Sequence, residues 1–337
     1  MPERKPHRTI TILDVAAEAD VSKSTVSLVL RDSPLIPGET SERVRRAAAK
    51  LGYVYNRRAG QLRGGASNTV GVVINDLMNP VFAEILVGVE RRLVDAGYVV
   101  LMAHTNENLV RQDAVLQTMR EQGAAGIVLC PALGTSRGLP KQVQSWGIPL
   151  VVLVRALGAG SYDFAGANTE RGVFAATKHL LGAGHKRIAY LGGQAGIMLE
   201  QRLKGFKAAL GERKLEFDEK LFFGSNPTRQ GGYDTMSLLL DNKSRATAAV
   251  CYNDIVAFGA MSALGERGLQ AGTDFALVGF DNVLDAAHSN PPLTTVDIRP
   301  SDLGEQAAAL LLGRIQEPER ARQIHLTEPK LLLRQSG

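Results

Sequence analysis

Apolar and polar positions over residues 11–31 alternate with the period of short helices. Thr11, with Asp14 three residues later, forms the capping-box pattern that opens a helix running to about residue 19. Ser22 can cap a second helix over about residues 23–31. Only two residues separate these helices, so the turn needs a residue that tolerates positive φ, and Asp20 is acceptable there. The spacing therefore predicts two packed helices joined by a tight turn.

A third helix and a linker follow this pair. The pattern predicts a helix over about residues 41–51, ended by Gly52, which suits a helix C-cap. Residues 56–65 then combine small and basic side chains with one apolar residue, Leu62. Three short helices before a linker predict a small helical domain that is separate from the rest of the chain.

From residue 70 onward, short apolar runs alternate with helical stretches, and the order of the runs repeats. Three pairs of expected strands match in order: 70–74 with 188–191, 126–130 with 248–251, and 149–154 with 275–280. This alternation is typical of doubly wound parallel sheets with helices on both faces. The fold class is therefore α/β, with a small all-α helix-turn-helix head and a two-lobed core. Ligands bind such sheets at their carboxyl edges, and two facing edges would form a cleft.

The charge of the chain is unevenly distributed. The 337 residues carry a net charge of +5, and the segment 1–63 holds 12 Lys and Arg against 7 Asp and Glu. The rest of the chain carries equal numbers of basic and acidic side chains, and 45% of the whole is apolar, which is ample for a large core. A basic head on a neutral body predicts a polyanionic partner for the head and another task for the body.

Cysteine usage and the N-terminal segment bear on the compartment. Cys130 and Cys251 lie in apolar runs without metal-ligand spacing, so we expect small buried side chains rather than redox or metal sites. The first ten residues contain no apolar signal core, and no run of 18 apolar residues occurs. We therefore expect a cytoplasmic protein with no membrane partner and no metal or cofactor.

The sequence contains only weak enzyme signals. The segment GGQAG at 192–196 lacks the GxGxxG spacing of a dinucleotide site. GTSRG at 134–138 matches GxSxG around Ser136, but three residues separate it from the expected strand, and a nucleophile elbow needs the serine directly at the strand end. HExxH and P-loop motifs are absent, and the six histidines are scattered. We therefore expect no enzymatic activity.

Polar residues at the expected strand ends are the candidates for binding a small molecule. Arg202 and Asp281 are the strongest, because a guanidinium and a carboxylate can grip hydroxyls or a carboxylate geometrically. Phe82 and Tyr252 could stack on a ring. The other candidates are Asn75, Asp76, Asn168 and Asn253. Each Asn or Asp could instead cap a helix or a turn.

Several motifs, read together, resemble the LacI/GalR family of bacterial transcription regulators over essentially the whole length. They are DVAxxAxVSxxTVSxVL, LGYxxNRxAxxL, NPVFAEI, GHKRIAYLGG, RLKGF, CYNDxxAxG, ALVGFDN and PPLTTV. The resemblance implies a helix-turn-helix head (1–55), a hinge helix (56–68) and a periplasmic-binding-protein-like core (69–337). Lobe 1 would span about 69–167 and 298–325, and lobe 2 about 168–297 and 326–337. The resemblance also implies a homodimer. The sequence shows no apolar heptad extension of the kind that would assemble dimers into a tetramer.

In such a head the second helix reads base edges in the major groove of double-stranded operator DNA. Here Lys23, Ser24 and Leu28 would face bases. Further candidates for DNA contact in the head, chiefly through phosphates, are Thr11, Ser22, Thr25 and Ser27. Family members often carry Arg where this chain has Leu28, and a leucine can contact a thymine methyl but cannot make a bidentate bond to guanine. The bases read at that position should therefore differ.

The linker matches the family hinge at Asn56, Arg57, Ala59 and Leu62. By resemblance, paired Leu62 side chains would wedge into the minor groove and bend the operator. Gly60 disfavours a helix by roughly 1 kcal/mol, so this segment should become ordered only on DNA. Tyr55 stands where the family often has Pro, which makes the entry to the hinge less rigid.

The family's effector contacts commonly fall at or beside positions matching Asn75, Asn168, Arg202, Asn253 and Asp281. Ala167 stands where relatives usually have Asp, which weakens the contact expected beside Asn168. The implied function is a repressor of transcription that a sugar or sugar derivative controls allosterically. A corepressor-dependent repressor or an activator would have the same fold. A periplasmic solute-binding protein shares the body but would need a signal peptide and no DNA-binding head.

Overall fold

The computed structural model describes residues 10–31, 33–54, 67–242 and 244–337. The chain divides into two compact units, residues 1–66 and residues 67–337. The predicted hinge contacts Asn56, Arg57, Ala59 and Leu62 lie outside the described residues.

The described part of the first unit contains three helices around a small apolar core. They are α1 (Ile12–Glu18), α2 (Lys23–Val29) and α3 (Gly38–Leu51). Asp20 in the tight turn has φ 50°, and Gly52 at the end of α3 has φ 65°, as the turn and the C-cap require. Helix α3 begins three residues earlier than the sequence pattern suggested. Pro37 has a ring-fixed φ and Glu39 is acidic in the first turn, so both already favour a helix start.

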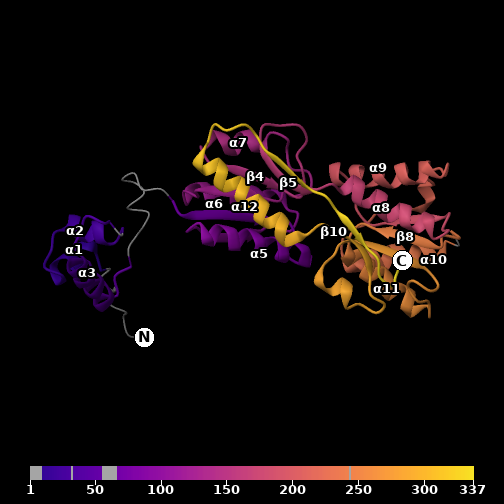
Figure 1. Cartoon of the computed structure of the whole chain (residues 1–337), viewed down its shortest axis with the longest axis horizontal. Helices are drawn as coiled ribbons and strands as arrows, with labels where there is room; N and C mark the ends of the chain where they lie inside the picture. The colour runs from indigo at the N-terminus through magenta and orange to yellow at the C-terminus, as the bar shows by residue number, and fades with distance from the viewer. Residues whose placement is uncertain (1–9, 32, 55–66, 243) are drawn as a thin grey trace, which may run out of the picture. The chain divides into compact units, whose positions relative to one another are not determined.

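The second unit consists of two lobes, each built on a six-stranded sheet (Figure 1). The sheet of lobe 1 has the order β11-β5-β4-β3-β1-β2, and all its strands are parallel. These strands are β1 (Thr69–Ile74), β2 (Val99–His104), β3 (Gly126–Leu129), β4 (Leu150–Leu153), β5 (Asp163–Ala167) and β11 (Ile324–Thr327). The helices are α5 (Pro80–Asp95), α6 (Leu109–Glu121), α7 (Leu139–Ser145) and α12 (Pro300–Gln316).

Alternate residues of the inner strands of lobe 1 pack on opposite faces of the sheet. Val72 and Val128 belong to the apolar cluster that contains α5 and α12, whereas Val73 and Ile127 pack with α6 and α7. Because the inner strands are covered on both faces, they appear in the sequence as continuous apolar runs.

The sheet of lobe 2 has the order β12-β10-β9-β8-β6-β7. Its strands are β6 (Ile188–Leu191), β7 (Phe222–Phe223), β8 (Ala248–Cys251), β9 (Ala276–Asp281), β10 (Thr294–Asp297) and β12 (Lys330–Leu332). Its helices are α8 (Thr169–Gly182), α9 (Ile197–Glu212), α10 (Arg229–Asp241) and α11 (Asp254–Glu266), with the short 3-10 helices η1 (Glu219–Leu221) and η2 (Leu284–Ala287). Two doubly wound sheets were expected, and five of these six strands are parallel.

The chain crosses between the lobes three times, after β5, after β10 and after β11. Strand β10 carries the chain out of lobe 2 and β12 returns it, so these two neighbours run antiparallel. The last crossing lies between Thr327 and Lys330, slightly later than the sequence boundary at 325.

Helices pack closely in both lobes through glycines. A Cβ on Gly88 of α5 would lie 2.0 Å from the carbonyl oxygen of Ser301, and one on Gly304 of α12 would lie 2.0 Å from that of Ile85. In lobe 2, a Cβ on Gly205 of α9 would lie 2.1 Å from the carbonyl oxygen of Glu170. These positions have no space for a side chain.

Candidate functional site

The candidate DNA-contact residues of the head lie mainly on helix α2. Val26 and Val29 face the core, while Ser22, Lys23 and Ser24 are exposed. Thr25, Ser27 and Leu28 are half-buried beside them. The 3.6-residue period thus separates a packing face from a polar face with a single lysine.

Four candidate hydroxyls of the head already have partners, including that of Ser24, which lies 3.1 Å from the Ser22 Oγ. The Ser22 Oγ caps α2 by accepting the Thr25 N–H at 3.1 Å, and it lies 2.9 Å from the Thr25 hydroxyl. Thr11 donates both its N–H and its hydroxyl to the Asp14 carboxylate, at 2.8 and 2.7 Å. These bonds hold the ends of α1 and α2, so any contact to a ligand by these groups is additional to a capping role.

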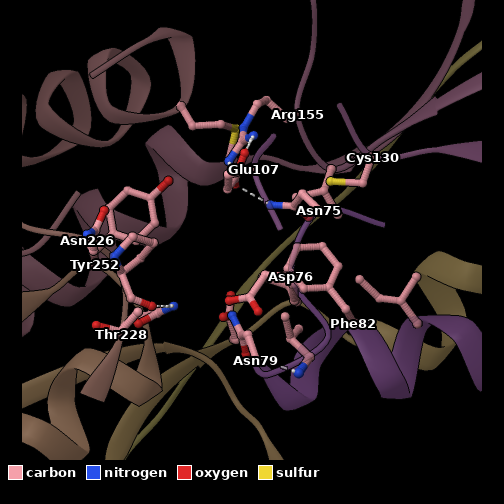
Figure 2. A pocket seen from close by; sticks show the side chains of 18 of the residues that line it. Asn75, Asp76, Asn79, Phe82, Glu107, Cys130, Arg155, Asn226, Thr228 and Tyr252 are labelled. Carbon is pink, nitrogen blue, oxygen red and sulfur yellow. Dashed lines mark hydrogen bonds and ion pairs between the residues drawn. The ribbon is translucent and has the colours of Figure 1, made fainter. Parts of the chain in front are cut away.

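A cavity of about 300 Å³ lies between the two lobes of the second unit (Figure 2). Its lining comes from loops at the carboxyl ends of strands in both sheets, from α5 and α9, and from the crossing after β10. Its size fits a small organic ligand. We call it the interlobe cavity.

Seven of the eight predicted effector residues line the interlobe cavity: Asn75, Asp76, Phe82, Arg202, Tyr252, Asn253 and Asp281. Asn168 does not. Its Oδ1 accepts the Arg171 N–H at 3.2 Å and caps α8, and its own N–H donates to the Thr327 carbonyl in the last crossing. Asn168 therefore has the capping role that was the alternative for every polar residue at a strand end.

On the lobe 2 side of the cavity, Arg202 is buried between two aromatic rings. Its guanidinium carbon lies 3.9 Å from the ring centroid of Phe280 and 4.4 Å from that of Tyr252. Its Nη1 donates to the Tyr252 carbonyl at 2.6 Å, while its buried Nε has no hydrogen-bond partner among the described residues. The rings hold the cation in place, and the Nε–H has no protein partner there that would compete with a ligand.

Asp281 ends strand β9 with φ 115°, a conformation that L-residues rarely adopt. Burial raises the pKa of Asp281 to about 7, although the charge of Arg202 and a hydrogen bond from Asn79 act in the opposite direction. Asp254, also buried, accepts from the Thr295 hydroxyl and the Val283 N–H at 2.5 and 2.9 Å. Asp281 is therefore the acid in the cavity wall whose charge responds to pH near neutrality.

On the lobe 1 side, Glu107 and Arg155 form a paired acid and base. Arg155 Nη1 donates to Glu107 Oε2 and Arg155 Nη2 to Glu107 Oε1, both at 2.9 Å. Burial opposes ionisation of Glu107, but the hydrogen bonds and charge of Arg155, with bonds from Asn75 and Leu133, leave its pKa below the ordinary value. The pair is thus ionised and internally neutralised.

The sequence reading missed both members of this pair, together with Asn79, Met198, Asn226 and Thr228 on the lining. The signal that identified Asn75, a polar residue after a strand, also applies to Glu107 after β2 and Arg155 after β4. Arg155 directly follows the expected strand at 149–154, so the same signal could have identified it.

Neither Cys130 nor Ser136 is part of a reactive centre in the described structure. Burial raises the pKa of Cys130, which lines the cavity, to about 12, so the thiol stays protonated. Ser136 lies in an exposed turn, where its Oγ accepts the Gly138 N–H at 3.1 Å. In the described part of the chain, no group of three His, Cys, Asp or Glu side chains could hold a metal ion. Over that same part, none of the helices has the length and apolar character needed to cross a bilayer.

Comparison with known families and proteins agrees in both units. The family described as "Bacterial regulatory proteins, lacI family" matches residues 11–56, and "Periplasmic binding protein-like domain" matches residues 177–337. An HTH-type transcriptional repressor PurR of Aliivibrio fischeri is 31% identical over 97% of this chain and 98% of its own. The ribose operon repressor of Haemophilus influenzae is 32% identical over the same shares.

Solved structures extend this likeness to the fold. A lac repressor dimer bound to operator and the anti-inducer ONPF superposes with a TM-score of 0.86 at 25% identity, covering 98% of this chain and 99% of that one. A complex of the regulator CelR with cellobiose gives a TM-score of 0.74 at 29% identity, with 97% and 100% covered. A regulator from Enterococcus faecium with bound ribose gives 0.73 at 28% identity, with 80% and 98% covered.

Proposed function

Because the chain belongs to the lacI family of bacterial regulatory proteins, we propose that it represses transcription by binding a palindromic operator as a homodimer, under control of a small polar effector. The observation that carries the proposal is that one chain joins a three-helix head with an exposed polar face on α2 to an interlobe cavity lined by Arg202 and Asp281. Such a regulator must reach the bacterial chromosome, so we place it in the cytoplasm.

The DNA contacts are assigned to the head and linker. Lys23, Ser24 and Leu28 would face bases, and the hydroxyl groups around them would position the phosphates. The linker residues Asn56, Arg57, Ala59 and Leu62 remain part of this proposal on the strength of the sequence motif alone. The excess positive charge of the segment 1–63 supports a polyanionic partner.

The effector is proposed to be a sugar or sugar derivative that induces release of DNA. Phe82 and Tyr252 offer ring faces on opposite sides of the interlobe cavity, and polar groups flank both (Figure 2). The relatives and solved structures named for ribose and cellobiose support this ligand class. Since both lobes line the cavity, a ligand that contacts both walls favours one arrangement of the lobes, which is the differential interaction that allostery requires.

Selection of random duplexes by the purified full-length protein tests the proposal. We expect enrichment of an inverted repeat, with an affinity that falls steeply with salt as counterions are released. Adding D-ribose or cellobiose should lower the affinity if either is the inducer, whereas a corepressor would raise it. A protein that binds enriched and scrambled duplexes equally, with and without sugars, would refute operator recognition.

A further inference from the structure

One carboxylate ties together four loops of lobe 1 at the interlobe cavity. Besides the two bonds from Arg155, Glu107 Oε1 accepts from Asn75 Nδ2 at 2.6 Å and Oε2 accepts from the Leu133 N–H at 2.5 Å. Arg155 Nη1 also donates to the Pro131 carbonyl at 2.5 Å. Asn75 follows β1, Glu107 follows β2, Pro131 and Leu133 follow β3, and Arg155 follows β4.

The backbone that positions this carboxylate has an unfavourable conformation. Asn106 and Glu107 have φ values of 53° and 56°, so two consecutive residues with side chains occupy the left-handed region. Such residues are unfavourable one at a time and persist only where the surroundings hold them. Figure 2 shows the Glu107 and Arg155 side chains together at one end of the pocket, with Asn75 directed at Glu107.

The pair determines which way the Asn75 amide faces. An ionised carboxylate only accepts hydrogen bonds, so Asn75 must present its Nδ2 to Glu107 and keep its Oδ1 turned away. That Oδ1 is buried and has no hydrogen-bond partner among the described residues, although Asn75 lines the cavity. Without the carboxylate, either end of the amide could face a ligand.

The opposite wall has the complementary property. Arg202, in lobe 2, has a buried Nε donor that lacks a partner within the described residues. Lobe 1 thus offers an unpartnered acceptor in Asn75, and lobe 2 offers an unpartnered donor in Arg202, on the same wall as the Asp281 carboxyl. Asp76 adds a second acidic group on the lobe 1 side, and the charge of Glu107 is already neutralised by Arg155.

Resting on the proposed function, we propose that Glu107 is a positioning residue that fixes the Asn75 amide, so that the cavity reads the effector in one orientation. A hydroxyl or N–H group of the effector donates to Asn75 Oδ1 in lobe 1. An acceptor group, including any carboxylate or phosphate oxygen, faces Arg202 Nε in lobe 2. An anionic group at the lobe 1 end would meet the carboxylate of Asp76 and the acceptor of Asn75.

The first experiment needs no effector. The full-length protein is labelled with ¹⁵N-asparagine, and the Asn75 side-chain NH₂ signals are assigned by their loss in Asn75→Ser. We expect signals shifted downfield, with hydrogen exchange at least tenfold slower than for exposed asparagines. Glu107→Gln should move these signals toward ordinary positions. Glu212→Gln is the control: it removes an ion pair with Lys178 elsewhere in the chain and should leave the signals unchanged. Asn75 signals at ordinary positions in the wild type would overturn the positioning role.

The second experiment separates positioning from mere stabilisation. It uses whichever of D-ribose and cellobiose raises the melting temperature of the wild type, together with the mono-O-methyl ethers of that sugar. Methylation at one hydroxyl should weaken binding to the wild type about tenfold by calorimetry, and Glu107→Gln should reduce that selectivity to about twofold.

Equal losses for all ethers in both proteins would mean that Glu107 only stabilises the loops. If neither sugar binds, the labelling experiment alone decides. Failure of operator binding would refute the proposed function while leaving the Asn75 signals unchanged, so the two failures are distinguishable.

Discussion

On the lobe 1 wall of the interlobe cavity the charged side chains satisfy one another, whereas on the lobe 2 wall they rely on aromatic rings and the backbone. Glu107 and Arg155 form two parallel bonds at 2.9 Å. Arg202 instead lies between the rings of Phe280 and Tyr252, and Asp281 is buried with its pKa raised to about 7. The Glu107–Arg155 pair of lobe 1 is thus neutralised without a ligand, whereas Arg202 of lobe 2 keeps a buried Nε donor that has no partner among the described residues.

This difference predicts that substitutions in the two walls have different effects. Where two charged groups pair with each other, substitution of one leaves the other buried without a partner, and the fold loses stability. Where a polar group lacks such a partner, its substitution lowers the affinity for a ligand or removes the free-energy cost of burying that group. Variants of the lobe 1 pair should therefore lose stability, whereas variants of the lobe 2 wall should lose ligand affinity or gain stability.

The largest effect is expected from Asp281→Asn, as a change in the pH dependence of stability. The folded carboxyl has a pKa of about 7 and the unfolded one about 3.8. The contribution of this carboxyl to stability is therefore fully present below pH 4 and is lost as pH rises through 7. Three pKa units set an upper limit of about 4 kcal/mol, which the neutral asparagine would regain above pH 7.

Urea unfolding at pH 5 and pH 8 covers about two of these pKa units and should show up to about 2.7 kcal/mol of the effect. Asp234→Asn, on the exposed face of α10, is the matched control and should keep the wild-type pH dependence. Equal pH dependence in the wild type and Asp281→Asn would show that the buried carboxyl stays ionised.

Arg202→Ala should weaken effector binding by about 100-fold, because it removes a charge-assisted donor and the stacked cation together. Operator affinity without effector should stay within about twofold of the wild type. Calorimetry and fluorescence anisotropy measure the two quantities, with Arg213→Ala, at the exposed end of α9, as control. Unchanged effector affinity would remove Arg202 from the binding wall.

Arg155→Ala should act on the fold instead. It leaves the Glu107 carboxylate without its main partner, and because 35% of that side chain is exposed we expect a loss of roughly 2 kcal/mol, below the range for fully buried pairs. Arg155→Lys should recover part of this loss, since one ammonium cannot make both parallel bonds. Urea unfolding of both variants tests this expectation. If Arg155→Ala were as stable as the wild type, the proposed difference between the two walls would be wrong.

A packing test should give similar results in the two lobes. Gly205→Ala places a Cβ 2.1 Å from the Glu170 carbonyl oxygen, and we expect a destabilisation of about 2 kcal/mol from overpacking. Gly211→Ala, in the same helix with nothing within 4 Å, should stabilise by roughly 0.5 kcal/mol. Gly88→Ala in lobe 1 should resemble Gly205→Ala in thermal unfolding, and a tolerated Gly88→Ala would show that the lobes are packed differently.

The sequence predicted the parts of the fold that depend on local periodicity. The buried strands appear as apolar runs, and the helix pair of the head is recognisable because Thr11, Ser22 and Asp20 stand at caps and in a tight turn. Tyr252, Asn253 and Asp281 of the lobe 2 wall were predicted because their strands were placed correctly, whereas Arg202 lies within helix α9 and not at a strand end as expected.

What the sequence did not reveal depends on pairing between distant loops. Glu107 and Arg155 are 48 residues apart, and only the sheet order brings their strands to one edge. Asn168 and Asn253 both follow a strand and both cap a helix, yet only Asn253 also lines the cavity, so the local sequence does not distinguish the two. The antiparallel β12 follows from the direction of a crossing, which no periodicity reveals.

The order in which the chain is synthesised gives the last crossing a further importance. Strands β11 and β12, which complete the two sheets, both lie in the terminal segment 324–337, and Ser336 seals lobe 2 through bonds to Leu277 and Thr294. On the ribosome, neither lobe can complete its sheet until residues 324–332 have emerged. A nascent chain that stalls before residue 324 would therefore expose edges of both sheets at once, and maturation of the two halves becomes a single late event.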